Sequence, residues 1–277
     1  MSLALWVQAA CIWEVCADKL GNVNRRFDFT DVTLVDFLLS AAAIAPVVAE
    51  VRTQGIGRTC LEAVRVTRRV CRSNTNLGMI LLLTPLAWTV QRDELAEVLS
   101  HCDVAEARQV VQAIREAQPG GLGQVEQQDI RDDPSLPLVE LMRLAPAHDR
   151  VARQYTTAFA EIFDEVIPDL RENLAQGIEA AVQHAQLRQL ARHGDSLIAR
   201  KAGSAESDEV RRRAAQVLAE PSKRQELDAW LRAEGHRRNP GTTADLLAAG
   251  LYVLLARGEL ELTHPWQRAG QTNPPAG

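Results

Sequence analysis

Apolar side chains recur every three or four residues along most of the chain, which is the spacing of amphipathic α-helices. Glycine, proline and capping residues separate these segments, and no set of alternating, strand-like segments appears between them. The sequence therefore predicts an all-α fold of roughly ten helices. The expected helices are residues 3–19, 34–50, 58–71, 77–90, 104–117, 138–144, a long segment over 149–177 that Pro168 interrupts, 178–192, 205–219, 224–233 and 243–256.

Length and composition are those of a globular domain. The chain has 277 residues, of which 46% are hydrophobic and 24% are charged, close to the average of globular proteins. It contains neither an internal repeat nor a linker, so we expect one compact multi-helix domain over residues 1–265. The polar, proline-rich residues 266–277 are expected to form a frayed tail.

Charge and aromatic content argue against nucleic acid as a partner. The formal net charge is -5, and only 4% of the residues are aromatic. Such a chain lacks the positive field of a non-specific nucleic-acid binder. It also lacks the aromatic platform on which single-stranded bases stack.

Cysteines and apolar runs indicate the compartment. The five cysteines form no C-x-x-C pair, which is typical of buried thiols in a reducing compartment. The longest apolar run, residues 77–90, is too short to span a bilayer. No signal-peptide pattern opens the chain, because Glu14, Asp18 and Lys19 interrupt the first apolar run. We therefore expect a cytoplasmic protein without a membrane partner, and a homodimer is the oligomer that general frequencies favour.

The candidate chemistry lies in the loops, which are rich in Gly, Asn and Asp beside basic residues. Residues 239–245 place Gly241 and Thr242 at a helix start, where free N–H groups favour a phosphate. The glycine run at 120–123 can bring backbone equally close to a ligand, although a plain turn explains it as well. The flanking bases that could neutralise phosphates are Lys19, Arg200, Lys201, Arg237 and Arg238.

Acidic residues form the complementary set in these loops and helix starts. Carboxylates beside phosphate-binding loops suggest Mg²⁺, which takes a few carboxylates and shares the phosphate oxygens of a substrate. Asp149 and Asp195 are interpreted first as helix N-caps. His148 and His236 lie near the loops without metal-ligand spacing and are interpreted as structural or exposed. The acids of the set are Glu14, Asp31, Asp129, Asp149, Asp195 and Asp245, of which Asp31 and Asp129 are the first functional candidates.

Six motifs in a fixed order cover almost the whole chain, from residue 14 to residue 246. They are Glu14-Val15 with Lys19, Gly21 and Val23; Asp31 with Asp36-Phe37 and Ser40-Ala41; Asn74-Thr75 with Gly78; Gly120-Gly121-Leu122-Gly123 with Asp129; Arg200-Lys201 with Gly203; and the run from Asn239 to Leu246.

This ordered set resembles the triphosphoribosyl-dephospho-CoA synthase family. The resemblance implies an all-α transferase that moves the 5-triphosphoribosyl group of ATP to the 2'-hydroxyl of 3'-dephospho-CoA and releases adenine. It implies ATP as a substrate and Mg²⁺ as a cofactor. By this resemblance the catalytic residues are Asp31, Asp129 and Asp245, and the metal ligands are Glu14, Asp31 and Asp129. The nucleotide- and phosphate-binding residues are Lys19, Gly21, Asn22, Asn74, Thr75, Gly121, Arg200, Lys201, Asn239, Gly241 and Thr242.

Three departures from the family pattern leave a second interpretation open. Asn76 and Leu77 stand where the family has His-Lys, Phe29-Thr30 replaces a second His-Lys, and Leu20 replaces a proline. The alternative is therefore an enzyme of the same fold that acts on another phosphorylated or pterin-type substrate in one-carbon (tetrahydromethanopterin-like) cofactor biosynthesis. A third hypothesis is a non-catalytic nucleotide-binding protein. The acids retained in the loops argue against it.

Overall fold

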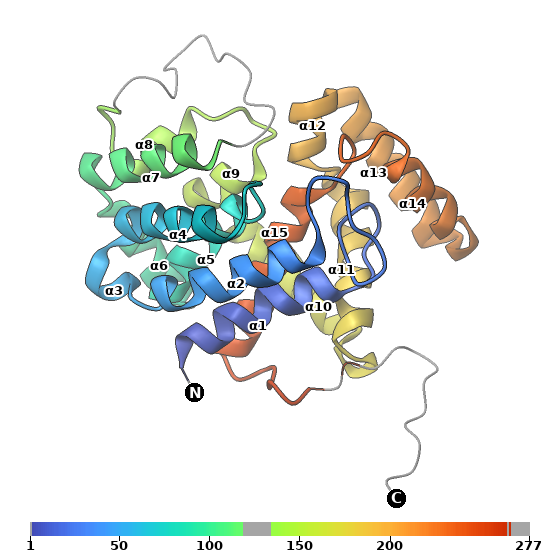
Figure 1. Ribbon diagram of the computed structural model, residues 1–277, viewed down its shortest axis with the longest axis horizontal. Helices are drawn as coiled ribbons and strands as arrows, with labels where there is room; N and C mark the ends of the chain where they lie inside the picture. The colour runs from blue at the N-terminus through green and yellow to red at the C-terminus, as the bar shows by residue number, and fades with distance from the viewer. Residues whose placement is uncertain (1, 119–133, 265, 267–277) are drawn as a thin grey trace, which may run out of the picture.

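The structure is a computed structural model that describes residues 2–118, 134–264 and 266 (Figure 1). The glycine run with Gly121, the acid Asp129 and nearly all of the expected tail over 266–277 lie outside the described residues. In the part of the chain that the structure describes, no helix is long and apolar enough to cross a membrane.

Helices account for the regular structure of the described ranges, which contain no strand. This confirms the predicted all-α class, whereas the expected number of roughly ten helices was too low. The fifteen α-helices described are α1 (Leu3–Cys16), α2 (Leu34–Val48), α3 (Val51–Gln54), α4 (Ile56–Val70), α5 (Leu77–Trp88), α6 (Arg92–Ser100), α7 (Val104–Ala117), α8 (Leu138–Arg143), α9 (Arg150–Thr156), α10 (Ile167–Glu172), α11 (Ile178–His193), α12 (Ser196–Ala202), α13 (Ser204–Ala219), α14 (Arg224–Arg232) and α15 (Gly241–Ala256).

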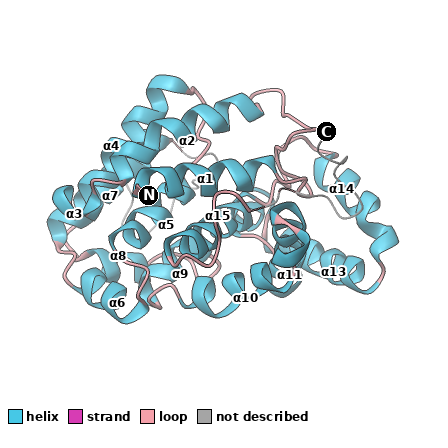
Figure 2. Cartoon of the chain, turned by 90° about the horizontal axis from the view of Figure 1, so that it is seen from below, coloured by secondary structure: helices cyan, strands magenta, loops and turns pink. Residues whose placement is uncertain are grey.

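Helix α15 forms the centre of the fold. Every residue from Leu246 to Leu255 is buried, which is expected of a helix that is apolar on all sides. It packs against α1, α5, α10 and α11, and Figure 2 shows these helices around it. Gly250 allows a close approach of the neighbouring chain, because a Cβ there would lie 2.8 Å from side-chain atoms of both Val166 and Leu170. Helix α5 is almost as fully buried, and its first turn lies beside that of α15.

Two groups of helices flank this centre. Helices α2, α4 and α7 pack on one another on the side of α1 and α5. Helices α11 to α14 form a second group with its own apolar cluster, which includes Leu190, Ile198, Val210 and Leu231 (Figure 1). The loop after α1 joins the two groups, because Leu20 belongs to the second cluster while Val7 and Cys11 belong to the main core.

The spacing of Tyr155, Phe159 and Phe163 suggests one long helix over residues 149–177, interrupted at Pro168. The structure does not have such a helix there. The segment consists of α9, a π-helical turn η1 (Ile162–Val166) and α10, followed by a 3-10 turn over Leu174–Gln176. Ala158 and Phe159 have positive φ angles of 48° and 58°, and they break the helix ahead of the π turn. The sequence gives no signal of this break, because both residues fit the apolar period.

We predict that Leu254→Ala destabilises the fold strongly. Leu254 is fully buried in α15, so the truncation loses apolar contacts and leaves a cavity, at a cost of about 2–5 kcal/mol in the free energy of unfolding. Leu218→Ala, at a position 39% exposed on α13, is the matched control and should change stability by about 0.5 kcal/mol or less. Urea unfolding of both variants tests this. Equal losses would contradict the central place of α15.

Candidate active site

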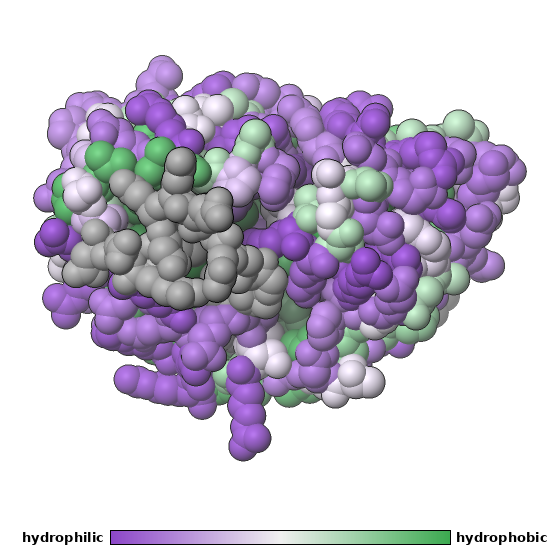
Figure 3. Space-filling view, turned by 90° about the horizontal axis from the view of Figure 1, so that it is seen from above, coloured by the Kyte–Doolittle hydropathy of each residue, from purple (hydrophilic) through white to green (hydrophobic). Residues whose placement is uncertain are grey.

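A cavity of about 1020 Å³ lies where the two groups of helices meet. Four helices, α5, α9, α12 and α15, contribute residues at or next to their N-termini to its wall, including Leu77, Asp149, Ser196 and Gly241. The partial positive charge of a helix N-terminus therefore acts on the cavity from several sides. In Figure 3 hydrophilic residues cover most of one face of the molecule, and apolar residues gather beside the residues drawn in grey.

Most of the residues selected from sequence lie together at this cavity. Outside the cavity wall are Glu14, Lys19 and Gly21, while Gly121 and Asp129 lie outside the described residues. The selected residues that line the cavity are Asp31, Asp245, Asn22, Asn74, Thr75, Arg200, Lys201, Asn239, Gly241 and Thr242.

Glu14 and Lys19 form a buried ion pair behind the cavity. The Nζ atom of Lys19 lies 3.0 Å from Oε1 of Glu14, and the two side chains are 1% and 2% exposed. The same ammonium donates to the backbone oxygen of Glu14. Burial raises the pKa of Glu14, and the charge of Lys19 opposes this shift. In this arrangement the ammonium of Lys19 is used within the protein, and the role of Glu14 as a metal ligand stays a prediction.

Gly21 shapes the turn that presents Asn22. Its φ of 70° favours glycine, and a Cβ there would lie 2.9 Å from Cβ of Leu231. The side chain of Asn22 accepts from Gln186 Nε2 at 2.9 Å and donates to Asn239 Oδ1 at 2.5 Å. Asn22 and Asn239 thus hold each other at the cavity wall. Their hydrogen bond joins the loop after α1 to the loop before α15.

Asp245 lies at the point where α15 meets the start of α5. The nearby backbone N–H of Met79 favours the ionised form of its carboxyl. Gly78 has no room for a side chain, because a Cβ there would overlap this carboxyl group. Burial raises the pKa of Asp245 well above its usual range, the charges of Glu14 and Asp195 raise it further, and Arg200 opposes the shift. Asp245 therefore keeps its proton to higher pH than an exposed aspartate.

The segment before α5 contains three polar residues with different roles. Asn74 Oδ1 accepts the N–H of Leu77 at 3.1 Å, so Asn74 caps the helix. The hydroxyl of Thr75 shares a hydrogen bond of 2.7 Å with Ser40. Asn76 occupies the N-cap position without capping the helix through its side chain. It is only 4% exposed, and its Nδ2 has no hydrogen-bond partner.

Arg200 and Lys201 lie in the last turn of α12, not in a loop as the sequence suggests. Both line the cavity, and neither forms an ion pair or hydrogen bond with a residue that the structure describes. Burial and the neighbouring Arg200 lower the pKa of Lys201, and Asp31 opposes this shift. By contrast, Arg237 and Arg238 pair with Glu234 and lie outside the cavity wall. Of these four cations, Arg200 and Lys201 are therefore the two open to an anionic ligand, and Arg72 also lines the cavity without an ion pair to a described residue.

At the mouth of the cavity Asp31 pairs with His236. Oδ1 of Asp31 lies 3.2 Å from Nδ1 of His236, and both side chains are about half exposed. The ring of Phe29 packs edge-on against the imidazole, with 5.9 Å between the ring centres. No pattern in the sequence places His236 beside Asp31, because the two residues are far apart along the chain.

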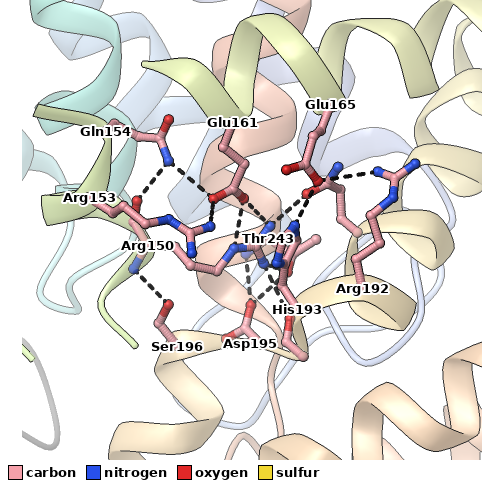
Figure 4. Close-up of polar contacts among 12 residues, drawn as sticks. Arg150, Arg153, Gln154, Glu161, Glu165, Arg192, His193, Asp195, Ser196 and Thr243 are labelled. Carbon is pink, nitrogen blue, oxygen red and sulfur yellow. Dashed lines mark hydrogen bonds and ion pairs between the residues drawn. The ribbon is translucent and has the colours of Figure 1, made fainter. Parts of the chain in front are cut away.

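A buried polar network supports the cavity wall (Figure 4). Arg150 is 3% exposed, and Figure 4 shows its guanidinium between Glu161 and Thr243. Its Nε donates to Glu161 Oε1 at 2.8 Å and its NH1 donates to Thr243 Oγ1 at 3.1 Å. A further bond of 2.7 Å reaches Gln189 on α11. The sequence did not reveal this network, since Arg150 and Glu161 have the helical context of surface residues.

Asp195 extends the network and confirms its predicted capping role. Its Oδ1 accepts the N–H groups of Leu197 and Ile198, which caps α12. Its Oδ2 accepts both the N–H and the hydroxyl of Thr243, at 2.7 and 2.8 Å, which joins α12 to the first turn of α15. Asp149 caps α9 in the predicted manner. The starts of three cavity helices are therefore held by one set of buried bonds.

The described side chains do not build a metal cage. Among the residues that the structure describes, no group of three or more His, Cys, Asp or Glu side chains could hold a metal ion. Mg²⁺ is usually bound through one or two carboxylates together with the phosphates of a substrate. This donor set is compatible with an ion that arrives with a nucleotide.

Helix N-termini, cations without an ion pair among the described residues and a carboxyl of raised pKa meet at one cavity of this all-α domain, as expected of an enzyme that acts on phosphorylated small molecules. Comparison with known proteins defines the class further. The family model of CitG, ATP:dephospho-CoA triphosphoribosyl transferase, matches residues 1–264. The chain therefore belongs to this family, and it is a transferase of the triphosphoribosyl-dephospho-CoA synthase type.

A solved structure agrees with this assignment. It is a protein from Archaeoglobus fulgidus with a provisional assignment as a triphosphoribosyl-dephospho-CoA synthase, 26% identical to this chain. The match covers 83% of this chain and 100% of that one, with a TM-score of 0.63. A search of curated proteins gave no match. The alternative of a pterin-type substrate is not favoured by these comparisons.

We predict that Glu161→Gln destabilises the protein by about 3–5 kcal/mol, because it leaves the buried charge of Arg150 without its partner. Burial alone would raise the pKa of Glu161, but Arg150 and Arg153 outweigh it and lower the pKa below 4.5. The wild type should therefore lose part of its stability as the pH falls from about 4.5 through the lowered pKa.

Denaturant unfolding at pH 7 and at acidic pH measures both effects. The control is Glu259→Gln, which breaks the exposed pair with Arg171 and should cost about 1 kcal/mol or less. A loss from Glu161→Gln no larger than that of the control would show that the network does not hold the cavity wall.

Proposed function

We propose that the cavity performs the family reaction by separating three tasks, which are triphosphate binding, proton donation to the departing base, and proton removal from the acceptor hydroxyl. The observation that carries this proposal is that one cavity contains Asp245 together with Arg200 and Lys201, two cations without an ion pair among the described residues. Breaking an N-glycosidic bond needs an acid at the leaving group, and a triphosphate needs cations.

The triphosphate binds at the side of the cavity formed by α12 and α15. Arg200 and Lys201 supply two positive charges there, and Gly241 and Thr242 bring the N-terminus of α15 to the same cavity. A helix N-terminus and charged donors favour the same ligand, since both act on phosphate oxygens. Asn239 and Asn22 hold the loop that leads into this helix.

Asp245 donates the proton that allows adenine to leave. The bond between C1' of the ribose and N9 of adenine breaks, its electron pair goes to the base, and the base takes the proton of Asp245. The oxygen of the acceptor hydroxyl then bonds to C1' and gives its proton to the pair of His236 and Asp31. Exchange with water returns both groups to their starting states. An imidazole held by a carboxylate suits proton removal near neutral pH.

We also propose that Mg²⁺ enters with ATP. Asp31 is the cavity carboxylate that would join the phosphate oxygens in holding it, and the ion would offset the negative charge of the triphosphate. Glu14 and Asp129 are further predicted Mg²⁺ ligands, and only the family resemblance supports them. The binding roles of Lys19, Gly21, Asn74, Thr75 and Gly121 also stay predictions.

We further propose a cytoplasmic location, which the five unpaired cysteines support. The homodimer stays a prediction as well. Val35 and Leu39 are exposed on one face of α2 and are the side chains that we expect at such a contact.

We predict that the wild type releases free adenine from ATP in the presence of dephospho-CoA, and that Asp245→Asn lowers kcat by at least roughly a hundredfold. In the wild type, kcat should fall as the pH rises through the pKa of Asp245, because the acid form is lost. Chromatographic detection of adenine measures both. Asp208→Asn, on the surface of α13, is the control and should keep full activity.

The same variant separates catalysis from folding. Because the folded-state pKa of Asp245 is raised above 3.8, the wild type loses stability as the pH rises from 3.8 to that raised value. Asp245→Asn removes this loss, so at neutral pH it should unfold at a temperature equal to or above that of the wild type. An inactive variant with this stability supports the catalytic role. Full activity of the variant would refute that role.

We predict that Arg200→Ala and Lys201→Ala each raise KM for ATP by roughly tenfold or more, since each removes a charge-assisted contact to phosphate. Steady-state kinetics with varied ATP measures the change. The control replaces the adjacent pair Arg211 and Arg212 on α13, which lies outside the cavity. An effect on KM for the acceptor alone would place the triphosphate elsewhere.

A further inference from the structure

Asn76 is a buried polar residue at the cavity whose amide is not used by the protein. It lines the cavity and is 4% exposed. Its Nδ2 atom is buried and has no hydrogen-bond partner. No other described residue of the cavity wall has a buried side-chain nitrogen or oxygen atom without a partner. Buried amide donors without partners are rare in folded proteins, so this one needs an explanation.

Helix capping does not explain Asn76. The N–H of Leu77 is bound by Asn74 at 3.1 Å, and Asn76 makes no side-chain capping bond. Asn74 thus supplies the cap, and the amide of Asn76 is left with a donor and an acceptor next to the cavity. A ligand in the cavity would supply the missing partner.

The surroundings of Asn76 indicate a neutral ligand group. Gly78, two residues further on, touches the carboxyl of Asp245, which holds its proton more strongly than an exposed aspartate. The cations of the cavity wall are Arg200 and Lys201 on α12, Arg68 on α4 and Arg72 in the loop between α4 and α5. At the start of α5 the cavity offers the amide of Asn76 and the carboxyl of Asp245, whose protonated form is favoured, and these are groups that recognise a heterocyclic base.

The chemistry of an amide matches one edge of adenine. Adenine presents the N7 acceptor beside the N6 amino donor, and an asparagine amide can bind both at once. Guanine presents the acceptor O6 in place of the amino group of adenine. Two acceptors, this O6 and the amide oxygen of the asparagine, would then face each other. An asparagine beside the proton donor would therefore select the base and hold it where it receives the proton.

We infer that Asn76 binds the departing adenine of ATP and makes the transferase selective for adenine nucleotides as donors. This inference rests on the proposed function, and it concerns the base of the donor, not the adenine of dephospho-CoA. Asn76 acts here as a residue that determines specificity, while the proton transfer remains with Asp245.

The test compares ATP with GTP as donors, with dephospho-CoA as the acceptor. We expect the wild type to prefer ATP in kcat/KM, and Asn76→Ala to lower the ratio of ATP to GTP by at least about fivefold. Asn76→Asp keeps the size of the side chain but loses the amide donor, so it should lower the ratio as well. It also provides the test if the alanine variant fails to fold.

A binding measurement independent of turnover accompanies the kinetics. Free adenine should raise the melting temperature of the wild type and should raise that of Asn76→Ala less. The control is Asn24→Ala, a buried asparagine outside the cavity wall that donates to Lys19 O at 3.1 Å. It should lower stability and leave both the donor ratio and the response to adenine unchanged.

Three results would overturn the inference: a wild type that uses ATP and GTP equally, an unchanged donor ratio in both Asn76 variants, or a change confined to KM for dephospho-CoA. In each of these the wild type still makes the product, so the proposed function stands. Failure of the wild type to release adenine would instead refute the proposed function.

Discussion

The buried contact between Arg150 and Glu161 is the interaction on which the cavity depends. Removing two charges from water is costly, and the cost is offset only where every donor and acceptor is satisfied. Arg150 meets this condition by also binding Gln189 and Thr243, and Asp195 binds Thr243 from the other side. The starts of α9, α12 and α15 are fixed together in this way. Their N-termini can therefore converge on one space without collapsing it.

The charges at this space are arranged for a ligand and not for maximum stability. Lys19 and Glu14 form an ion pair behind the wall, whereas Arg200 and Lys201 form no ion pair with a described residue and interact with Asp245 and Asp31 only at longer range. Asp245 is placed where burial and nearby acids favour its neutral form. Functional sites commonly contain groups with such perturbed proton affinities, because the chemistry needs an acid and cations that the ligand, and not the protein, neutralises.

The sequence predicted the all-α class and most helices, because apolar spacing and capping residues are local signals. The polar loops and the family resemblance together selected ten of the residues that line the cavity. The sequence did not predict the break at Phe159 or the partnership of Arg150 with Glu161, since both depend on contacts between distant segments. It also placed Arg200 in a loop, although the residue belongs to the last turn of α12.

The departures from the family pattern are compatible with the proposed binding of a triphosphate. Asn76 and Leu77 lack the positive charges that the family has there, and they lie beside Asp245 at the start of α5. A cation at that position would stabilise the ionised form of this carboxyl, lower its pKa and leave less of the protonated form at neutral pH. Without such a cation the carboxyl keeps its proton to higher pH, and in the proposed reaction Arg200 and Lys201 on α12 supply the positive charge for the phosphates. The absence of basic side chains at residues 76 and 77 is thus compatible with separate sites for adenine and for the phosphates.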